Sequence, residues 1–102
     1  MTVRLHILKI WPEFLHEIIN GNNTASLRKA DRDYRVGDWV ELRGYDANLE
    51  RYTASAARCE ITHIVAPGHP VFPPVLKDYV LLSLRHTPFP NDTDVQVIEP
   101  KE

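Results

Sequence analysis

The sequence lacks most features of a metal centre, a disulfide scaffold or a membrane protein. Cys59 is its single cysteine, so the chain alone forms no disulfide, cysteine-based zinc cluster or redox pair. Its 102 residues contain no apolar run long enough to cross a bilayer. The N-terminal stretch MTVRLHILKIWPE has no small-residue cleavage site after its apolar part. We therefore expect a cytoplasmic protein without a membrane partner, stabilised by packing alone.

The sequence also lacks a strong excess of charge. Its formal net charge of −2, with 43% hydrophobic and 25% charged residues, fits an ordinary globular domain that is too short for two cores. A net charge this close to zero gives no sign of the strongly basic surface that is typical of duplex-binding proteins. Near the C-terminus one cation, Lys101, stands against four carboxylates, at Asp92, Asp94, Glu99 and Glu102. We predict a single domain over residues 1–90 and an acidic tail over residues 91–102.

One short segment concentrates basic residues. Four cations and two carboxylates fall within eight positions, at Arg28, Lys29, Asp31, Arg32, Asp33 and Arg35. One interpretation is a solvated loop in which these side chains satisfy one another. The other is a phosphate-binding cluster, because a guanidinium can donate two parallel hydrogen bonds to a phosphate. The spacing alone leaves both open.

Periodicity predicts a mixed domain of short strands with one early helix. Alternation of period two predicts strands over residues 3–10, 24–29, 39–45, 56–65 and 79–85, with residues 95–98 as a further edge strand. Strands 39–45 and 56–65 should pair as a hairpin. In the first strand, Val3, Leu5 and Ile7 alternate with Arg4 and His6, which predicts one buried face.

The helix is predicted to begin at Pro12, a residue suited to a first turn, and to end at Gly21. Its apolar face comprises Phe14, Leu15, Ile18 and Ile19. Four prolines between Pro67 and Pro74 exclude a central strand and predict a stiff surface loop. The predicted fold class is α+β: a small barrel of five or six mixed or antiparallel strands, with the helix capping one end.

Several short motifs occur in an order that resembles a known family. They are His6-Ile7-Leu8-Lys9, Pro12, a G-x-x-T-x-x-x-R segment from Gly21 to Arg28, Arg28-Lys29-Ala30-Asp31-Arg32, Val36-Gly37-Asp38 and Gly44-Tyr45-Asp46. Over roughly residues 4–85 this order resembles the PUA-like superfamily, in particular its ASCH branch. It is most similar to an uncharacterised ASCH-related family found in phages and bacteria.

The resemblance implies a β-barrel with a groove beside the first helix that holds RNA or a modified nucleobase. One ASCH branch hydrolyses the acetyl amide of acetylated cytidine, using a lysine, a threonine and a distant glutamate. Here Asn23 stands at the position of that lysine, and an amide cannot act as nucleophile or proton acceptor at neutral pH. Ser26 could keep a hydroxyl role, and Asp78 is the nearest carboxylate candidate.

The residues expected to bind RNA or a nucleotide are His6, Lys9, Thr24, Ser26, Arg28, Lys29, Arg32 and Tyr45. Arg28 is central, since it shares the polar face of its strand with Thr24 and Ser26. Lys29 and Arg32 would attract phosphate, and Tyr45 offers a ring on which an unstacked base can lie. His6 and Lys9 point to opposite faces of a regular strand, so they share a site only if the chain bends before Trp11.

Our leading hypothesis is a non-catalytic module that binds RNA or a modified nucleotide with modest affinity, because few phosphates could be neutralised. The histidines show no metal-ligand spacing, and no nucleotide-cofactor fingerprint is present, so we expect neither metal nor cofactor. One alternative is an amidohydrolase of N-acylated nucleosides built from Lys9, Thr24, Ser26 and Asp78. Another is a phage-type protein that binds a host protein through a sheet edge or the loop from Pro67 to Pro74.

Overall fold

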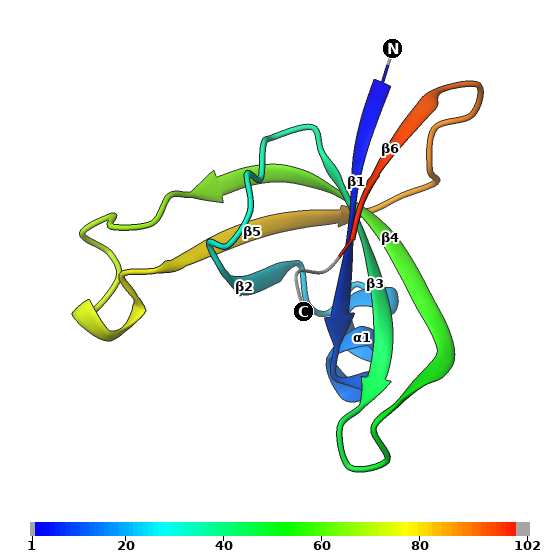
Figure 1. The fold of residues 1–102 in the computed structure, drawn as a ribbon, viewed down its shortest axis with the longest axis horizontal. Coiled ribbons are helices and arrows are strands. Elements are labelled where there is room, and N and C mark those ends of the chain that lie inside the picture. The colour runs from blue at the N-terminus through cyan, green and yellow to red at the C-terminus, as the bar shows by residue number, and fades with distance from the viewer. Residues whose placement is uncertain (1, 100–102) are drawn as a thin grey trace.

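The computed structural model describes residues 2–99 and shows one curved sheet with one α-helix against it (Figure 1). The elements in chain order are β1 (Thr2–Ile10), α1 (Pro12–Ile19), β2 (Ala25–Lys29), β3 (Trp39–Asp46), β4 (Arg51–Val65), the 3-10 helix η1 (Pro74–Leu76), β5 (Tyr79–His86) and β6 (Asp94–Ile98). The prediction of an α+β domain with an early helix is confirmed. Residues 100–102 of the predicted tail lie outside the described residues.

The six strands lie in the order β2-β5-β4-β3-β1-β6. β1 is parallel to both β3 and β6, whereas the β3–β4, β4–β5 and β2–β5 pairs are antiparallel. The predicted hairpin of β3 and β4 is confirmed. Part of the predicted acidic tail therefore forms the edge strand β6, because residues 94–98 pair with residues 2–6 of β1.

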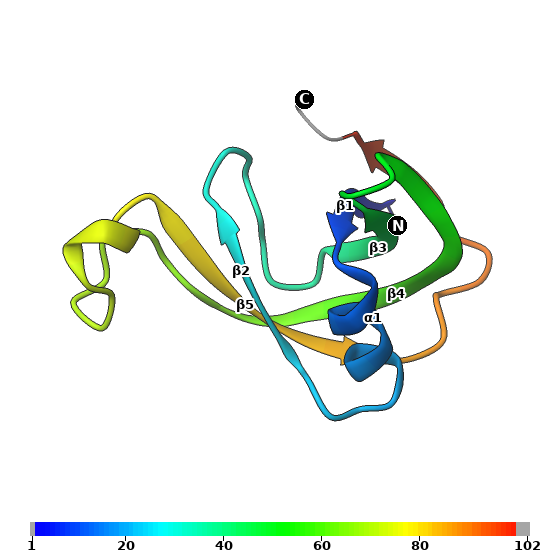
Figure 2. The same cartoon turned by 90° about the horizontal axis from the view of Figure 1, so that it is seen from below.

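The sheet curves strongly but is not closed by backbone pairing among residues 2–99. β4 bends around α1, which lies in the hollow of the sheet (Figure 2). Side chains of β2 and of the loop that follows it instead reach β1 and β6. Arg28 of β2 donates a 2.7 Å hydrogen bond to the backbone oxygen of Lys9 in β1, and Arg32 donates a 3.4 Å hydrogen bond to that of Ile98 in β6. The strand pairing thus shows an open mixed sheet where we predicted a closed barrel.

β4 is longer than its sequence pattern predicted. It begins at Arg51 rather than Ala56, and its first residues extend the hairpin beyond an irregularity between Arg43 and Tyr45. Residues 51–56 are exposed, so they carry no alternation of buried and exposed positions for periodicity to detect. The extension brings Tyr52 opposite Tyr45.

Two apolar clusters lie on opposite faces of the sheet. The larger contains Leu8, Ile10, Leu15, Ile18, Val40, Leu42, Ala57, Cys59, Ile61, Val80, Leu82 and Leu84, and the smaller contains Val3, Leu5, Ile7 and Trp39 with Phe89 packed against them. The prediction that β1 has only one buried face is therefore wrong. Because β1 lies between two parallel neighbours, both of its faces are covered, as is usual for parallel strands.

α1 begins at Pro12 and ends before Asn20 and Gly21, as predicted. Leu15 and Ile18 are buried in the larger cluster, but Phe14 and Ile19 remain exposed, which corrects the predicted apolar face. In this helix of eight residues, only Leu15 and Ile18 are buried. This leaves Phe14 free to line a pocket.

Candidate functional site

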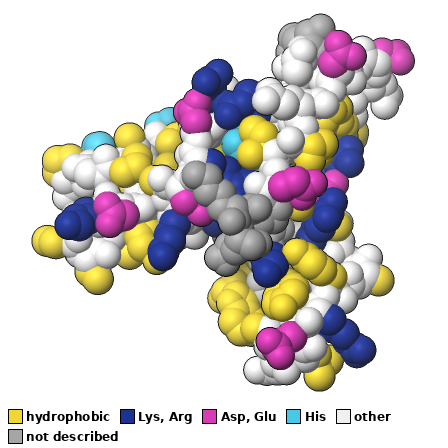
Figure 3. Space-filling view, viewed as in Figure 1, with side chains coloured by type: hydrophobic (Ala, Val, Ile, Leu, Met, Phe, Trp, Pro, Cys, Tyr) yellow, Lys and Arg dark blue, Asp and Glu magenta, His cyan; other side chains and the backbone are white. Residues whose placement is uncertain are grey.

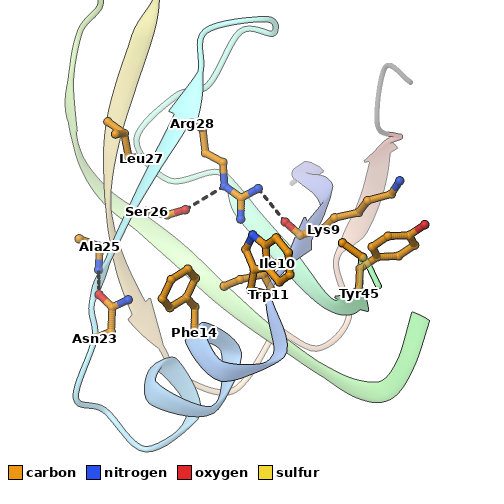
Figure 4. Close-up of a pocket in the computed structure, with 11 residues that line it drawn as sticks. Lys9, Ile10, Trp11, Phe14, Asn23, Ala25, Ser26, Leu27, Arg28 and Tyr45 are labelled. Carbon is orange, nitrogen blue, oxygen red and sulfur yellow. Dashed lines mark hydrogen bonds between the residues drawn. The ribbon is translucent and has the colours of Figure 1, made fainter. Parts of the chain in front are cut away.

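A pocket of about 500 Å³ lies beside α1, between the end of β1 and β2 (Figure 4). Its walls come from the end of β1, Trp11 and the first turn of α1, from Asn23 and β2, and from the end of β3 with the start of the β3–β4 loop. The lining residues are Lys9, Ile10, Trp11, Phe14, Asn23, Ala25, Ser26, Leu27, Arg28, Tyr45 and Ala47. Four of the sequence-predicted site residues, Lys9, Ser26, Arg28 and Tyr45, are thus brought together.

Arg28 forms the polar wall of the pocket. Its Nε donates a 2.8 Å hydrogen bond to the Ser26 hydroxyl, and one Nη donates to the Lys9 carbonyl (Figure 4). Ser26 and Arg28 alternate along β2, which places both on the half-buried face of this strand. Two fixed hydrogen bonds therefore hold the guanidinium plane across the gap between β2 and β1.

Arg28 forms no direct ion pair with a carboxylate within residues 2–99, although the charge of Asp31 acts on it from a greater distance. Asp31 and Asp33, its predicted structural partners, instead lie 3.6 Å from Arg32 and 2.6 Å from Arg35. Burial is the main cause that lowers the pKa of Arg28. Because both acceptors of this half-buried cation are neutral, the pocket favours an anion.

The opposite wall is apolar and aromatic. Trp11 and Phe14 are 48% and 52% exposed, and both line the pocket. Trp11 lies directly before Pro12, which starts the helix, and Leu15 occupies the buried position. Trp39, in contrast, is buried in the smaller cluster. The pocket thus combines a guanidinium with rings that can stack on a flat ligand.

Lys9 and Tyr45 form one end of the pocket. The ammonium of Lys9 lies 4.4 Å from the centre of the Tyr45 ring, a cation–π contact, and Figure 4 shows the lysine side chain extending toward this ring. The Tyr45 ring packs edge-on against Tyr52 at 5.0 Å. Lys9 is the last residue but one of β1, next to the first turn of α1.

Asn23, at the position of the lysine in the hydrolytic ASCH branch, also lines the pocket. Its side-chain oxygen accepts a hydrogen bond of 3.1 Å from the backbone amide of Ala25. This contact fixes the amide orientation and leaves the NH₂ group as a donor. Asp78, the carboxylate candidate of the hydrolase alternative, is not among the lining residues; its backbone oxygen accepts from Ala30.

The other predicted site residues do not line the pocket. Thr24 and Lys29 are exposed beside it, and Arg32 is largely buried against Asp31, Ile98 and the ring of Tyr34. His6 is fully buried on the opposite face of β1 from Lys9, as its spacing predicted.

His6 belongs to a buried polar cluster organised by Asp38. One Asp38 oxygen accepts hydrogen bonds from His6 Nε2 at 2.8 Å, Arg4 Nη1 at 2.9 Å and the Arg35 amide at 3.0 Å. The ring of His6 also packs against that of Tyr34, with centroids 4.7 Å apart. The cluster fixes the loop that joins β2 to β3, and it is separate from the pocket. The sequence gives no sign of this role for Asp38, because its partners Arg4 and His6 are 34 and 32 positions away.

The acid sensitivity of the fold should depend on His6. Burial, as the main cause, lowers its pKa from 6.5, although the hydrogen bond to Asp38 opposes this; Arg32 and Arg4 lower it further. As the pH falls below 6.5, the His6 ring is therefore protonated more readily in the unfolded chain than in the folded chain. The free energy of unfolding should decrease as a result. One such group contributes at most about 1.4 kcal/mol per pH unit.

Urea unfolding between pH 7.5 and pH 5.5 measures this slope for the wild type and for His6→Gln. The variant should be less stable but show a flatter dependence on pH, because the titrating ring is gone. Equal slopes in the two proteins would contradict the assignment to His6.

Residues 2–99 contain neither a candidate metal centre nor a membrane-spanning helix. No group of three or more histidine, cysteine, aspartate or glutamate side chains is arranged to hold a metal ion. No helix in this part of the chain has the length and apolar character needed to span a membrane. The buried thiol of Cys59 has a pKa raised to about 11 by burial, so it is protonated at neutral pH.

The proline-rich segment is a surface loop, as predicted, and it lies between β4 and β5, away from α1 (Figure 1). Val71 and Val75 on this loop are largely exposed.

The chain is thus an α+β domain in which a curved mixed sheet and a short helix enclose a cationic, aromatic-walled pocket. It belongs to the family described as a domain of unknown function (DUF3850), whose model matches residues 5–84. The matched span covers Lys9, Arg28 and Tyr45 of the pocket and ends before β6. No curated protein matches the chain.

Proposed function

We propose that this domain is a non-catalytic binding module for RNA or a modified nucleotide, and that the pocket beside α1 holds one nucleotide. The observation that carries the proposal is Arg28, a half-buried cation whose hydrogen-bond acceptors are the Ser26 hydroxyl and a backbone carbonyl. A phosphate would supply the missing negative charge through charge-assisted hydrogen bonds.

The remaining walls suit a nucleobase. Trp11 and Phe14 offer exposed rings for stacking, and base–aromatic stacking contributes about 1–3 kcal/mol per base. The NH₂ group of Asn23 can donate to an acceptor on the base edge. A volume of about 500 Å³ is within the range typical of small-molecule sites.

The lining residues support binding rather than hydrolysis. None of them is an aspartate, glutamate or histidine, the side chains that most often act as general acid or base. The hydroxyl of Ser26 already accepts from Arg28, and the amine of Lys9 rests on the Tyr45 ring. Of the proposed hydrolase residues, only Lys9 and Ser26 reach the pocket.

We also propose that the fold is a PUA-like, ASCH-related domain whose barrel is left open between β2 and β6. The support is the strongly curved sheet, the helix in its hollow and the pocket beside that helix (Figure 2). Arg28 and Arg32 act as side-chain links where a closed barrel would have backbone pairing.

Intrinsic fluorescence tests the proposal, since Trp11 lines the pocket whereas Trp39 is buried elsewhere. Titration at low salt with single-stranded RNA, tRNA, nucleotides and acetylcytidine should quench the signal, and Trp11→Phe should remove most of the change. If none of these ligands binds at low salt, the proposal fails. Release of acetate from acetylcytidine would instead support the amidohydrolase alternative.

Binding of a host protein is a second proposal, favoured by the exposed valines of the loop between β4 and β5. Val75 is 80% exposed. A pull-down partner that is lost on Val71→Ser with Val75→Ser, but retained on Arg28→Gln, would favour this function over nucleotide binding.

A further inference from the structure

A second polar and aromatic surface leads away from the pocket across β3 and β4. We call it the β3–β4 strip, and it consists of Lys9, Arg43, Tyr45, Tyr52 and Arg58. Strand register places these residues beside one another: Lys9 lies opposite Arg43, Tyr45 opposite Tyr52, and Arg58 opposite Glu41. Lys9 and Tyr45 also line the pocket, so the strip is continuous with it.

The guanidinium groups of the strip keep free donors. Arg43 and Arg58 each donate through Nε to one oxygen of Glu41, at 2.6 Å and 2.8 Å. Their terminal amino groups make no hydrogen bond to any residue within 2–99. With Lys9 the strip has three cations. The neighbouring carboxylates are Glu41, which accepts from both guanidinium groups, and Glu99, which acts on Arg43. The strip therefore retains a small excess of positive charge.

The two tyrosines form a platform of rings. They pack edge to face with centroids 5.0 Å apart, and Tyr52 is 46% exposed. An exposed ring next to a pocket that holds one base can stack on the neighbouring base of a strand. Arg58 extends the row of cations toward Phe89, over which its guanidinium lies at 4.5 Å.

We propose that the β3–β4 strip binds the nucleotides that flank the one in the pocket, so that the ligand is a single-stranded nucleic acid of several nucleotides. This inference rests on the proposed function of the pocket. A single strand fits because its bases are free to stack on Tyr52 while Arg43 and Arg58 contact phosphates. On the side of the molecule that Figure 3 draws, basic side chains are scattered among acidic and apolar ones, without the continuous basic patch expected of a duplex-binding surface.

The test compares one nucleotide with a short strand. We expect the wild type to bind a single-stranded pentanucleotide about 10- to 100-fold more tightly than the corresponding 5′-monophosphate, since one or two further bases stack. Tyr52→Ala with Arg43→Gln should remove most of this advantage and leave mononucleotide affinity within about twofold. Leu49→Ala, an exposed change in the same hairpin, serves as the control.

Salt dependence provides a readout that a purely structural role would not alter. Each phosphate contact contributes a slope of about −0.7 to log affinity against log salt for single strands. Arg43→Gln alone should therefore reduce the slope for the pentanucleotide by about 0.7 and leave that for the mononucleotide unchanged.

The outcomes separate the two proposals. If the pentanucleotide binds no more tightly than the mononucleotide, or if a duplex of the same sequence binds better, the strip inference is overturned while the pocket proposal survives. If neither ligand binds, the pocket proposal fails first. The inference is supported both by equal affinity for RNA and DNA pentanucleotides and by a preference for RNA. The comparison of the two shows whether the 2′-hydroxyl contributes.

Discussion

Replacing Arg28 with glutamine is expected to lower the affinity of the pocket for a nucleotide by about 10- to 100-fold. Hydrogen bonds to charged groups contribute about 1.5–3 kcal/mol, and each 1.4 kcal/mol corresponds to a factor of ten. Glutamine keeps a planar polar group but removes the charge that the pocket leaves without a carboxylate partner within residues 2–99. Quenching of Trp11 fluorescence at fixed low salt measures the change.

Lys29→Gln is the matched control for this substitution. It removes the same charge from the neighbouring residue of β2, but Lys29 is exposed and does not line the pocket. We expect Lys29→Gln to weaken binding less than about threefold. Equal losses in the two variants would show a general charge effect and contradict a specific role for Arg28.

Arg28→Lys separates charge from geometry. An ammonium keeps the positive charge but cannot reproduce the planar fork that spans Ser26 and the Lys9 carbonyl while facing a ligand. The nucleotide affinity of Arg28→Lys should lie between the affinities of the wild type and Arg28→Gln. Thermal unfolding of all three proteins shows whether the link between β2 and β1 has been lost, and wild-type affinity in Arg28→Gln would refute the assignment.

The sequence predicted the order of elements well because each carries a strong local signal. Pro12 and Gly21 mark the ends of α1, and alternation marks β3 and β5. The start of β4 was missed because residues 51–56 are exposed and show no alternation. The two covered faces of β1 were missed because they result from its central position between parallel strands, which is a property of the whole sheet.

The site was predictable where neighbours in sequence share one face of a strand. Ser26 and Arg28 are two residues apart on β2 and meet in the pocket. Trp11 and Phe14 were not predicted as lining residues, because local periodicity does not show which apolar residues of a short helix the sheet leaves uncovered. Arg32 does not line the pocket, and its guanidinium donates instead to the backbone oxygen of Ile98, 66 positions away in sequence.

Removal of the Asp38 carboxylate should cause a large loss of stability. Asp38 is only 5% exposed, and one of its oxygens accepts hydrogen bonds from Arg4, His6 and the Arg35 amide. Asp38→Ala would leave the Arg4 guanidinium and the buried imidazole without this acceptor. Breaking a buried charge pair by removing one partner typically costs about 3–5 kcal/mol. Since small domains have about 5–15 kcal/mol in total, urea unfolding should show a clear decrease in midpoint.

Asp33→Ala is the control for the loss of a carboxylate in the same loop. Asp33 pairs with Arg35 at the exposed surface, so its removal should leave the urea midpoint nearly unchanged.

A second comparison adds Arg4→Met and His6→Leu to Asp38→Ala. Replacing the whole buried cluster by apolar side chains removes the unpaired groups as well, so this triple variant should recover part of the lost stability. A loss below about 1 kcal/mol for Asp38→Ala would show that the cluster does not hold the loop between β2 and β3 in place.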